Sequence, residues 1–265
     1  MNTDKHRLQQ QYWTGKSVLI TGASSGLGWA ITEALAPYRV HFCLLSRRTD
    51  PMQELVRKLG SSGSRFWIRA CDVRNREQVE LAVNDFVTEA GRIDAAWVNS
   101  GITGDTSFQN WDWSVVEQII DTNVKGALYT SHACLRQMVV QGNGAIIAIS
   151  SAAAMRGLPG RSIYSLTKIG LSAYMEAMAA ELTQIQFTTI YPGFVDTPIN
   201  QNNPRRFWLM TPESAAQLML RAVAKGKCEY IYPFRMKLLF HLMRMLPAPL
   251  YRWVGHRMMD ISRPQ

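Results

Sequence analysis

The sequence predicts an α/β protein in which a parallel sheet is covered by helices on both faces. Three observations support this prediction. Short apolar runs alternate with longer segments of helical periodicity along the chain. The runs are apolar at nearly every position, as is typical of strands that are buried on both faces. The first run, SVLIT at 17–21, is followed at once by the glycine-rich GASSGLG and then by a helical pattern, which makes a strand–turn–helix unit.

The predicted strands and helices follow one another in a regular order. We expect strands at 17–21, 39–46, 65–73, 93–101, 144–151, 187–193 and 228–233. Helical patterns lie between them at 29–37, 51–60, 76–91, 114–140, 164–184 and 212–226. Because no internal repeat, low-complexity block or linker interrupts this order, we expect residues 1–265 to form a single domain with a doubly wound sheet of about seven strands.

Composition argues against several classes of protein. Apolar residues make up 47% of the 265 residues, which is ordinary for a folded domain. No run approaches the roughly 20 apolar residues of a membrane-spanning helix, and the first residues carry no apolar signal-peptide core, so we expect a cytoplasmic protein. The four cysteines lie far apart without a Cys-x-x-Cys pair, which argues against a disulfide framework or a zinc site.

Positive charge is concentrated near the C-terminus. The formal net charge is +9, and the segment from Arg221 onward contributes +7 of it, with nine Lys and Arg against Glu229 and Asp260. Such a segment can bind nucleic acid, contact an anionic membrane or simply face solvent. No recognised nucleic-acid-binding module accompanies the charge, so nucleic acid is not expected as a partner.

The glycine-rich turn after the first strand predicts a dinucleotide site in a Rossmann-type fold. Gly22 permits a tight turn, Gly26 lets the backbone approach a ligand, and Gly28 lets the helix pack against the strand. The helix that follows offers free N–H groups and the positive end of its dipole, which suit a pyrophosphate. The turn's other expected cofactor contacts are Ser24, Ser25 and Leu27.

The end of the second strand favours NADP(H) over NAD(H). Folds that are specific for NAD place an acidic residue there, which accepts from the ribose 2′-hydroxyl. This chain has Ser46-Arg47-Arg48 instead. A guanidinium can bind a 2′-phosphate with two hydrogen bonds, whereas a carboxylate would repel it. The alternative is that both arginines only face water.

Tyr164 and Lys168 stand four residues apart on a predicted helix, in the sequence IYSLTK. Residues at this spacing lie on the same helix face. Ionising an unperturbed tyrosine at pH 7 costs about 4 kcal/mol, and a nearby ammonium can supply part of this. The pair is therefore a candidate for proton transfer, with a chance surface pairing as the alternative.

Two further polar positions support the candidate. The strand at 144–151 delivers Ser150 and Ser151 at its C-terminal end, where ligands of open α/β sheets bind. Asn123 lies inside a long helical pattern, where an amide is mildly unfavourable and therefore suggests a specific role.

These motifs together resemble the short-chain dehydrogenase/reductase family over about residues 15–200. The family's TGxxxGxG matches 21–28, and all four residues of its Asn-Ser-Tyr-Lys tetrad are present at the family's spacing. Three shorter motifs also match. The family's Asp-Val after the third strand matches Asp72-Val73, and its Pro-Gly after the sixth strand matches Pro192-Gly193. Its Asn-Asn-Ala-Gly after the fourth strand matches 98–101, with two departures. The tetrad residues are Asn123, Ser151, Tyr164 and Lys168.

The resemblance implies a role for each matching residue. Tyr164 exchanges a proton with the substrate oxygen, to which Ser151 hydrogen-bonds, with Ser150 as the alternative serine. Lys168 holds the nicotinamide ribose and favours the tyrosinate, and Asn123 holds a water that links Lys168 to solvent. The further cofactor contacts that the resemblance implies are Asp72, Val73, Asn99, Ser100, Gly101, Pro192, Gly193, Val195 and Thr197.

Three positions depart from the family pattern. Val98 and Ser100 replace Asn and Ala in the fourth-strand motif, and neither change removes catalytic chemistry. Relatives that prefer NADP often carry a basic residue where Ser25 stands. Its absence leaves more of the phosphate-binding task to Arg47.

Substrate choice is expected to depend on the segment after Gly193, where the sequence is individual. We expect a lid over the substrate at about 194–212 and then a helix with Thr211 as its cap. A basic amphipathic extension follows at about 234–265. We expect a helix at 235–246, with Lys237, His241 and Arg244 on one face, and a second short helix at 251–259. This extension can roof the substrate pocket, form a subunit contact or lie on a membrane surface.

The sequence therefore predicts an oxidoreductase that transfers a hydride between NADP(H) and the carbonyl or secondary alcohol of an apolar, lipid-, acyl- or steroid-like molecule. The alternatives are a non-catalytic NADP(H)-sensing protein and a membrane-associated scaffold. The family resemblance also implies a homodimer or homotetramer. His241 and His256 have no spacing that suggests a metal site, so none is expected.

Overall fold

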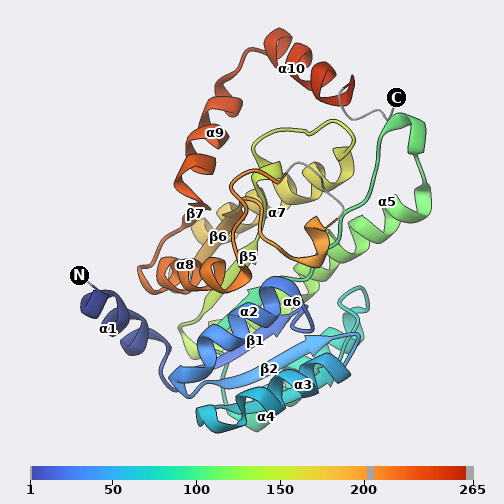
Figure 1. Ribbon diagram of the computed structural model, residues 1–265. Coiled ribbons are helices and arrows are strands. Elements are labelled where there is room, and N and C mark those ends of the chain that lie inside the picture. The colour runs from blue at the N-terminus through green and yellow to red at the C-terminus, as the bar shows by residue number, and fades with distance from the viewer. Residues whose placement is uncertain (1, 202–205, 261–265) are drawn as a thin grey trace.

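The centre of the molecule is a parallel sheet of seven strands in the order β3-β2-β1-β4-β5-β6-β7 (Figure 1). The computed structural model describes residues 2–201 and 206–260. The strands are β1 (Ser17–Thr21), β2 (His41–Ser46), β3 (Arg65–Ala70), β4 (Ala95–Val98), β5 (Ala145–Ile149), β6 (Gln186–Pro192) and β7 (Glu229–Tyr232). The chain starts in the middle and winds first to one edge and then to the other, which confirms the predicted doubly wound fold.

Helices cover both faces of the sheet. They are α1 (Asn2–Trp13), α2 (Gly26–Leu35), α3 (Asp50–Leu59), α4 (Arg76–Ala90), α5 (Trp113–Ile120), α6 (Gly126–Gln141), α7 (Ser162–Glu181), α8 (Pro212–Ala224), α9 (Phe234–Met245) and α10 (Ala248–Asp260). One core packs α1, α2, α3 and α8 against the sheet, and a second core packs α4, α6 and α7 against the opposite face. Strand β1 contributes to both cores, since Val18 and Ile20 belong to the first and Leu19 to the second.

Strands β1 and β2 end where the apolar pattern predicted, whereas the other strands end one to three residues earlier. We expected a strand at 93–101, but β4 ends at Val98. The next residue, Asn99, donates its backbone N–H to the Thr21 hydroxyl and its side-chain amide to the Thr21 carbonyl. The carboxyl edge of the sheet is thus built from side-chain contacts rather than from a longer ladder.

The long helix expected at 114–140 is interrupted. Helices α5 and α6 are joined by a π-helical turn, η4 (Asp121–Lys125), which contains Asn123. Single π turns inside helices are common at functional sites. After the turn, α6 starts at Gly126, where an added Cβ atom would lie 2.7 Å from the Val73 side chain. The helix therefore approaches the loop after β3 closely.

Helix α1 was not expected, because its residues are mostly polar. Its last residue, Trp13, is fully buried and donates its indole N–H to the carbonyl of Leu220 in α8. The Trp13 ring also stacks against Trp97 of β4, with 6.1 Å between the ring centroids. The contacts of Trp13 with α8 and β4 thus help to hold a helix that periodicity does not reveal.

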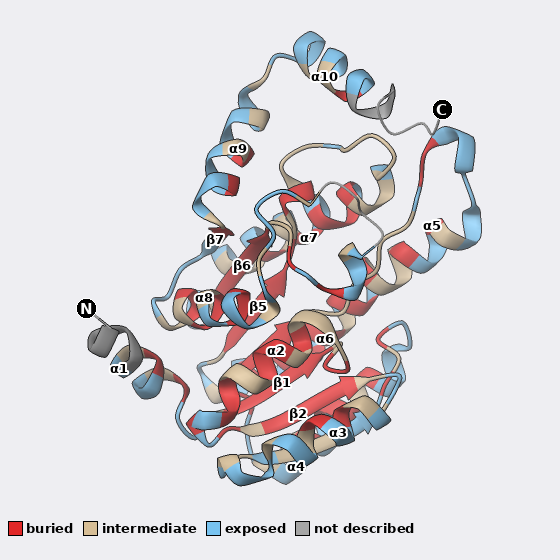
Figure 2. Ribbon diagram, in the orientation of Figure 1, coloured by how far each residue is buried: buried red, intermediate tan, exposed pale blue. Residues whose placement is uncertain are grey.

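Helices α9 and α10 follow β7 and project away from the sheet (Figure 1). The prediction of a helix at 235–246 and a second one at 251–259 is confirmed within one to three residues at each end. Figure 2 shows that most of both helices is exposed. None of the helices in the described part of the chain is long and apolar enough to cross a bilayer.

Candidate active site

The turn between β1 and α2 is shaped by its glycines. Gly22 and Gly26 have φ angles of +68° and +56°, the left-handed region that favours glycine. A Cβ atom on Gly28 would overlap with the carbonyl oxygen of Gly22, so only glycine fits where α2 crosses the turn. The turn is thus built for close backbone approach, as its sequence predicted.

The N-terminus of α2 is open to a ligand. Its capping residue, Ser25, makes no side-chain capping hydrogen bond, so the first N–H groups of the helix keep their donor capacity. The methyl group of Thr197 packs over Gly26, at 3.4 Å from the position of an added Cβ atom. The segment after β6 therefore meets the glycine turn, and both can face one anionic group.

The end of β4 braces this turn. The amide of Asn99 donates to the carbonyls of Thr21 and Gly22, and the N–H of Ser100 donates to the Thr21 hydroxyl. An added Cβ atom on Gly22 would lie 3.0 Å from the Asn99 amide. Asn99 and Ser100 therefore lie beside the glycine turn, although nearly 80 residues separate them along the chain.

The end of β2 presents both arginines to solvent. The hydroxyl of Ser46 donates to that of Ser24, which joins the β2 end to the glycine turn at 2.8 Å. Arg47 and Arg48 follow, and both are exposed. The neighbouring carboxylate, Asp72, accepts hydrogen bonds from the Arg74 guanidinium, which holds its pKa below the usual value, and Arg47 adds to this shift.

Ser151 and Tyr164 meet at the carboxyl end of β5. Their side chains share a hydrogen bond. Burial raises the pKa of Tyr164 above its ordinary value, and the Ser151 bond and the charge of Arg161 oppose this shift. The protein groups by themselves therefore keep Tyr164 protonated at neutral pH, whereas the sequence led us to expect a lowered pKa. In this state the phenol is a proton donor.

The second serine at this strand end has a different environment. The Ser150 hydroxyl is buried and lies within hydrogen-bond distance of the Ser172 hydroxyl and the Lys168 carbonyl. It thus ties β5 to the backbone of α7. Ser151, in contrast, accepts from the N–H of Ala153 and faces Tyr164.

The ammonium of Lys168 is buried behind Tyr164. It donates to the carbonyl of Ile149 at 2.8 Å and lies 5.7 Å from the centre of the Tyr164 ring. Burial lowers the pKa of Lys168 to about 8. None of the ion pairs found among the described residues includes Lys168. A buried cation without a carboxylate partner is typical of a site that receives polar groups of a ligand.

Asn123 holds the loop that faces this lysine. Its amide accepts from the N–H of Ile102 at 2.8 Å and donates to the Ile102 carbonyl at 2.9 Å, and it also donates to the Thr167 hydroxyl. An added Cβ atom on Gly101 would lie 3.3 Å from the Lys168 ammonium and 3.4 Å from the Asn123 side-chain oxygen. The structure thus gives the Asn123 side chain a bracing position, and its part in a proton relay stays a prediction.

The segment after β6 runs from the sheet edge toward the cofactor turn. Gly193 donates to the Tyr232 carbonyl, and Val195 pairs with Met210 in a short parallel bridge. Thr211 caps α8 by accepting from the N–H of Ser214, as the sequence predicted. Residues 202–205 of the expected lid lie outside the described residues, and its two flanks are joined by an ion pair between Asp196 and Arg206.

A model of the short chain dehydrogenase family matches residues 16–206. The chain belongs to the short-chain dehydrogenase/reductase family. It is 34% identical to an uncharacterized oxidoreductase of Myxococcus xanthus, over 92% of this chain and 97% of that protein. It is 30% identical to the ketoacyl reductase HetN of a Nostoc species, over 91% and 90% of the two chains. A crystal structure of a short-chain dehydrogenase/reductase from Mycobacterium marinum superposes with a TM-score of 0.78 at 28% identity, covering 84% of this chain and 96% of that one.

Short-chain dehydrogenases bind a nicotinamide dinucleotide, and the residues present fit such a group. The uncapped α2 N-terminus and the glycine turn can hold its pyrophosphate. The Lys168 ammonium has donor capacity for a ribose hydroxyl, since among the described residues it donates only to the Ile149 carbonyl. Among the described residues, no group of three His, Cys, Asp or Glu is arranged to hold a metal ion.

Sequence reasoning missed two arginines near this short-chain dehydrogenase site. Arg161 donates to the Thr103 hydroxyl and lowers the pKa of Tyr164 by its charge. Its position three residues before Tyr164 in the sequence was the available signal. Arg74 holds Asp72, two residues before it. Arg161 lies three residues from Tyr164 and Arg74 lies two residues from Asp72, but sequence spacing does not show which way a long side chain folds.

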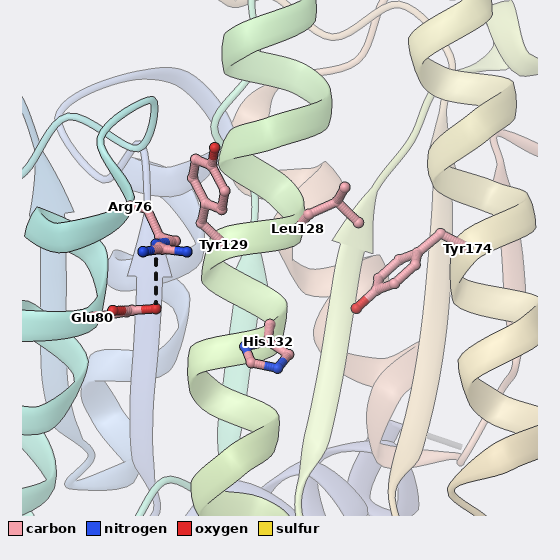
Figure 3. A pocket seen from close by; sticks show the side chains of 6 residues that line it. All are labelled: Arg76, Glu80, Leu128, Tyr129, His132 and Tyr174. Atoms are coloured by element: carbon pink, nitrogen blue, oxygen red, sulfur yellow. Dashed lines mark ion pairs between the residues drawn. The ribbon is translucent and has the colours of Figure 1, made fainter.

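A pocket on another part of the molecule takes no part in this chemistry. It lies between α4, α6 and α7, and none of the tetrad residues lines it (Figure 3). Its wall is formed by Arg76, Glu80, Leu128, Tyr129, His132 and Tyr174.

Proposed function

We propose that this oxidoreductase transfers a hydride between NADP(H) and the carbonyl or secondary alcohol of an apolar molecule. The observation that carries the proposal is the convergence of the Ser151 hydroxyl, the protonated Tyr164 and the buried Lys168 ammonium at the carboxyl end of β5. The glycine turn for the cofactor lies at the same edge of the sheet.

The side chains supply the proton and the charge stabilisation of a carbonyl reduction. Ser151 and Tyr164 both hydrogen-bond the carbonyl oxygen, and Tyr164 gives that oxygen its proton while the carbon receives the hydride. Lys168 stabilises the tyrosinate that forms, because its ammonium lies behind the phenol ring. A bound nicotinamide supplies or accepts the hydride. Alcohol oxidation uses the same groups in the reverse direction.

The two arginines after β2 support NADP(H) as the cofactor. Arg47 and Arg48 are exposed and form no ion pair within the described part of the chain, so both can engage a 2′-phosphate. The carboxylate of Asp72, which interacts with the charge of Arg47, is already held by Arg74. The end of β2 itself offers no carboxylate to the 2′-hydroxyl of NAD.

Apolar side chains around the expected lid support an apolar substrate. Phe207, Trp208 and Leu209 are exposed although they are large and apolar, and Phe207 packs edge-on against Phe194. Exposed apolar groups of this kind often mark a binding surface. The similarity to a ketoacyl reductase also supports a substrate with an acyl chain.

A homo-oligomer is proposed as well. Helices α6 and α7 carry exposed apolar side chains, which are Leu128, Val139, Val140, Leu166 and Ile169. Light scattering during size exclusion should give a dimer or a tetramer, and a monomer at micromolar concentration would contradict this part of the proposal.

The function is tested by a screen of ketones and aldehydes that are graded by size and polarity. We expect NADPH oxidation with the larger apolar ketones and little or none with small polar ones. A chain that binds NADPH but reduces no carbonyl compound would instead identify a cofactor-sensing protein.

A further inference from the structure

The outward face of α9 carries a stripe of exposed apolar side chains. Phe234, Leu238, Leu242 and Met245 follow one another at spacings of four, four and three residues, which places them on one side of the helix. Their exposed fractions are 80%, 67%, 57% and 80%. A stripe of this size is unusual on the surface of a soluble protein.

The opposite face of α9 already packs against the protein. Met236 and Phe240 are buried and form a small core with Tyr191 and Ile231 at the end of the sheet. The Phe240 ring meets the Tyr191 ring edge-on at 5.2 Å. The exposed stripe is therefore a second apolar face, and the fold of the chain does not need it.

Helix α10, which follows α9 in the chain, also carries exposed apolar side chains. Leu250 and Trp253 are exposed, and the guanidinium of Arg257 lies 5.6 Å from the centre of the Trp253 ring. Arg156 holds the connection between the helices by donating to the carbonyls of Met243 and Leu246, and it also stacks on the Tyr251 ring. Figure 2 shows both helices with a largely exposed outer side.

Basic residues border the apolar stripe. Residues 234–257 contain no Asp or Glu, and their lysines and arginines are Arg235, Lys237, Arg244, Arg252 and Arg257. All five are exposed. None of them forms an ion pair with any described residue. The surface thus combines apolar side chains, a tryptophan and uncompensated positive charge.

We propose that the outer face of α9 and α10 binds the surface of an anionic lipid bilayer, with both helices lying in the plane of the interface. Amphipathic helices with a basic border insert their apolar side between headgroups while the cations meet anionic lipids. Trp253 is of the residue type that favours this interfacial depth. The helices do not span the bilayer, in agreement with their length and polarity.

The positive charge of this face argues against a second copy of the chain as its binding partner. A two-fold contact would place this face against itself. The ten lysines and arginines of the two copies would then meet without any carboxylate in residues 234–257 to pair with them. An anionic bilayer satisfies both the charge and the apolar stripe.

Vesicle co-sedimentation of the full chain tests this proposal without any assay of activity, and it does not rest on the proposed reaction. We expect binding to phosphatidylcholine vesicles that contain phosphatidylglycerol, and at least about tenfold weaker binding to phosphatidylcholine alone. The double variant Lys237→Glu/Arg244→Glu should lower the partition coefficient by about tenfold or more, and Leu238→Asp/Leu242→Asp should lower it similarly. All four side chains are exposed, so circular dichroism and thermal unfolding should match the parent chain.

The matched control is Arg57→Glu/Arg65→Glu, which makes the same charge change on exposed residues of α3 and β3 at the far edge of the sheet. This control should bind vesicles within about twofold of the parent chain, since its charges lie far from the interface. An equal loss in both charge variants would show a non-specific effect of net charge and overturn the proposal. Absence of vesicle binding, together with a dimer that Leu238→Asp/Leu242→Asp dissociates, would assign the face to a second copy instead.

Discussion

The Lys168 ammonium donates a 2.8 Å hydrogen bond to the carbonyl oxygen of Ile149, the last residue of β5. This contact places the cation directly below the strand end that carries Ser151, and it does so in a buried environment. Burial lowers the pKa of Lys168 to about 8, while burial of the phenol raises the pKa of Tyr164. The pKa values of the Tyr164 phenol and the Lys168 ammonium are thus shifted in opposite directions, as is common in active sites.

Carbonyl reduction should depend on pH through Lys168. Below about pH 8 the lysine is charged and Tyr164 is protonated, which is the state that reduction requires. As the pH rises through about 8, the cation is lost, so kcat/KM for ketone reduction should fall. A profile from pH 6 to 10 measures this. The variant Lys168→Arg keeps its charge over the whole range, so a fall at the same pH in that variant would assign the titration to another group.

Lys168 should also reduce the stability of the fold. The pKa in the folded state is about 8, below the ordinary value of 10.5, so folding disfavours the charged form. The resulting loss in the free energy of unfolding is fully present below pH 8 and disappears as the pH rises above 10.5. Lys168→Met should therefore raise the free energy of unfolding at pH 7 by up to about 3 kcal/mol, less the lost hydrogen bond, and by less at pH 10. Urea unfolding at the two pH values measures the difference, and a less stable variant at pH 7 would contradict the assigned pKa.

Gly28 should tolerate no side chain. An added Cβ atom overlaps with the Gly22 carbonyl, so Gly28→Ala should destabilise the fold by roughly 1–3 kcal/mol and weaken cofactor binding. The control is Gly170→Ala in α7, where an added Cβ atom meets nothing within 4 Å. Since alanine favours helices more than glycine does, this control should stabilise the protein by up to about 1 kcal/mol. Equal effects of the two changes in urea unfolding would refute the packing argument.

The order of the fold was predictable from the sequence, because unbroken apolar strands and helical periodicity are local patterns. The end points of β4 and the break in the helix at Asn123 were not, because both depend on side-chain contacts with distant residues, Thr21 and Ile102. Helix α1 was missed for the same reason, since Trp13 is held by α8 and β4.

The sequence motifs predicted the positions of the tetrad residues, but they did not predict the direction in which the pKa of Tyr164 is shifted. Spacing places Lys168 near Tyr164, whereas only the packing around both residues shows that burial is the largest influence on both pKa values. The sequence favoured Ser151 over Ser150, and the structure adds that Ser150 bonds to α7 whereas Ser151 interacts with the phenol of Tyr164.

Cofactor preference should depend on Arg47. If its guanidinium binds a 2′-phosphate, Arg47→Ala should weaken NADPH binding by about 10- to 100-fold and leave NADH binding nearly unchanged. Titration of each cofactor by fluorescence measures both constants. Arg39→Ala is a control with an exposed arginine before β2 rather than after it. Equal weakening of NADPH and NADH in Arg47→Ala would rule out a 2′-phosphate contact.

The most direct test of the proposed function uses the variant Tyr164→Phe. It measures the variant's NADPH-linked reduction of a ketone and its affinity for NADPH. This change removes the hydroxyl that we propose as the proton donor and keeps the ring near Ser151 and Lys168. We expect turnover to fall by about 100- to 10,000-fold while NADPH binds as tightly as before. Turnover within about threefold of the parent enzyme would show that Tyr164 is not the proton donor.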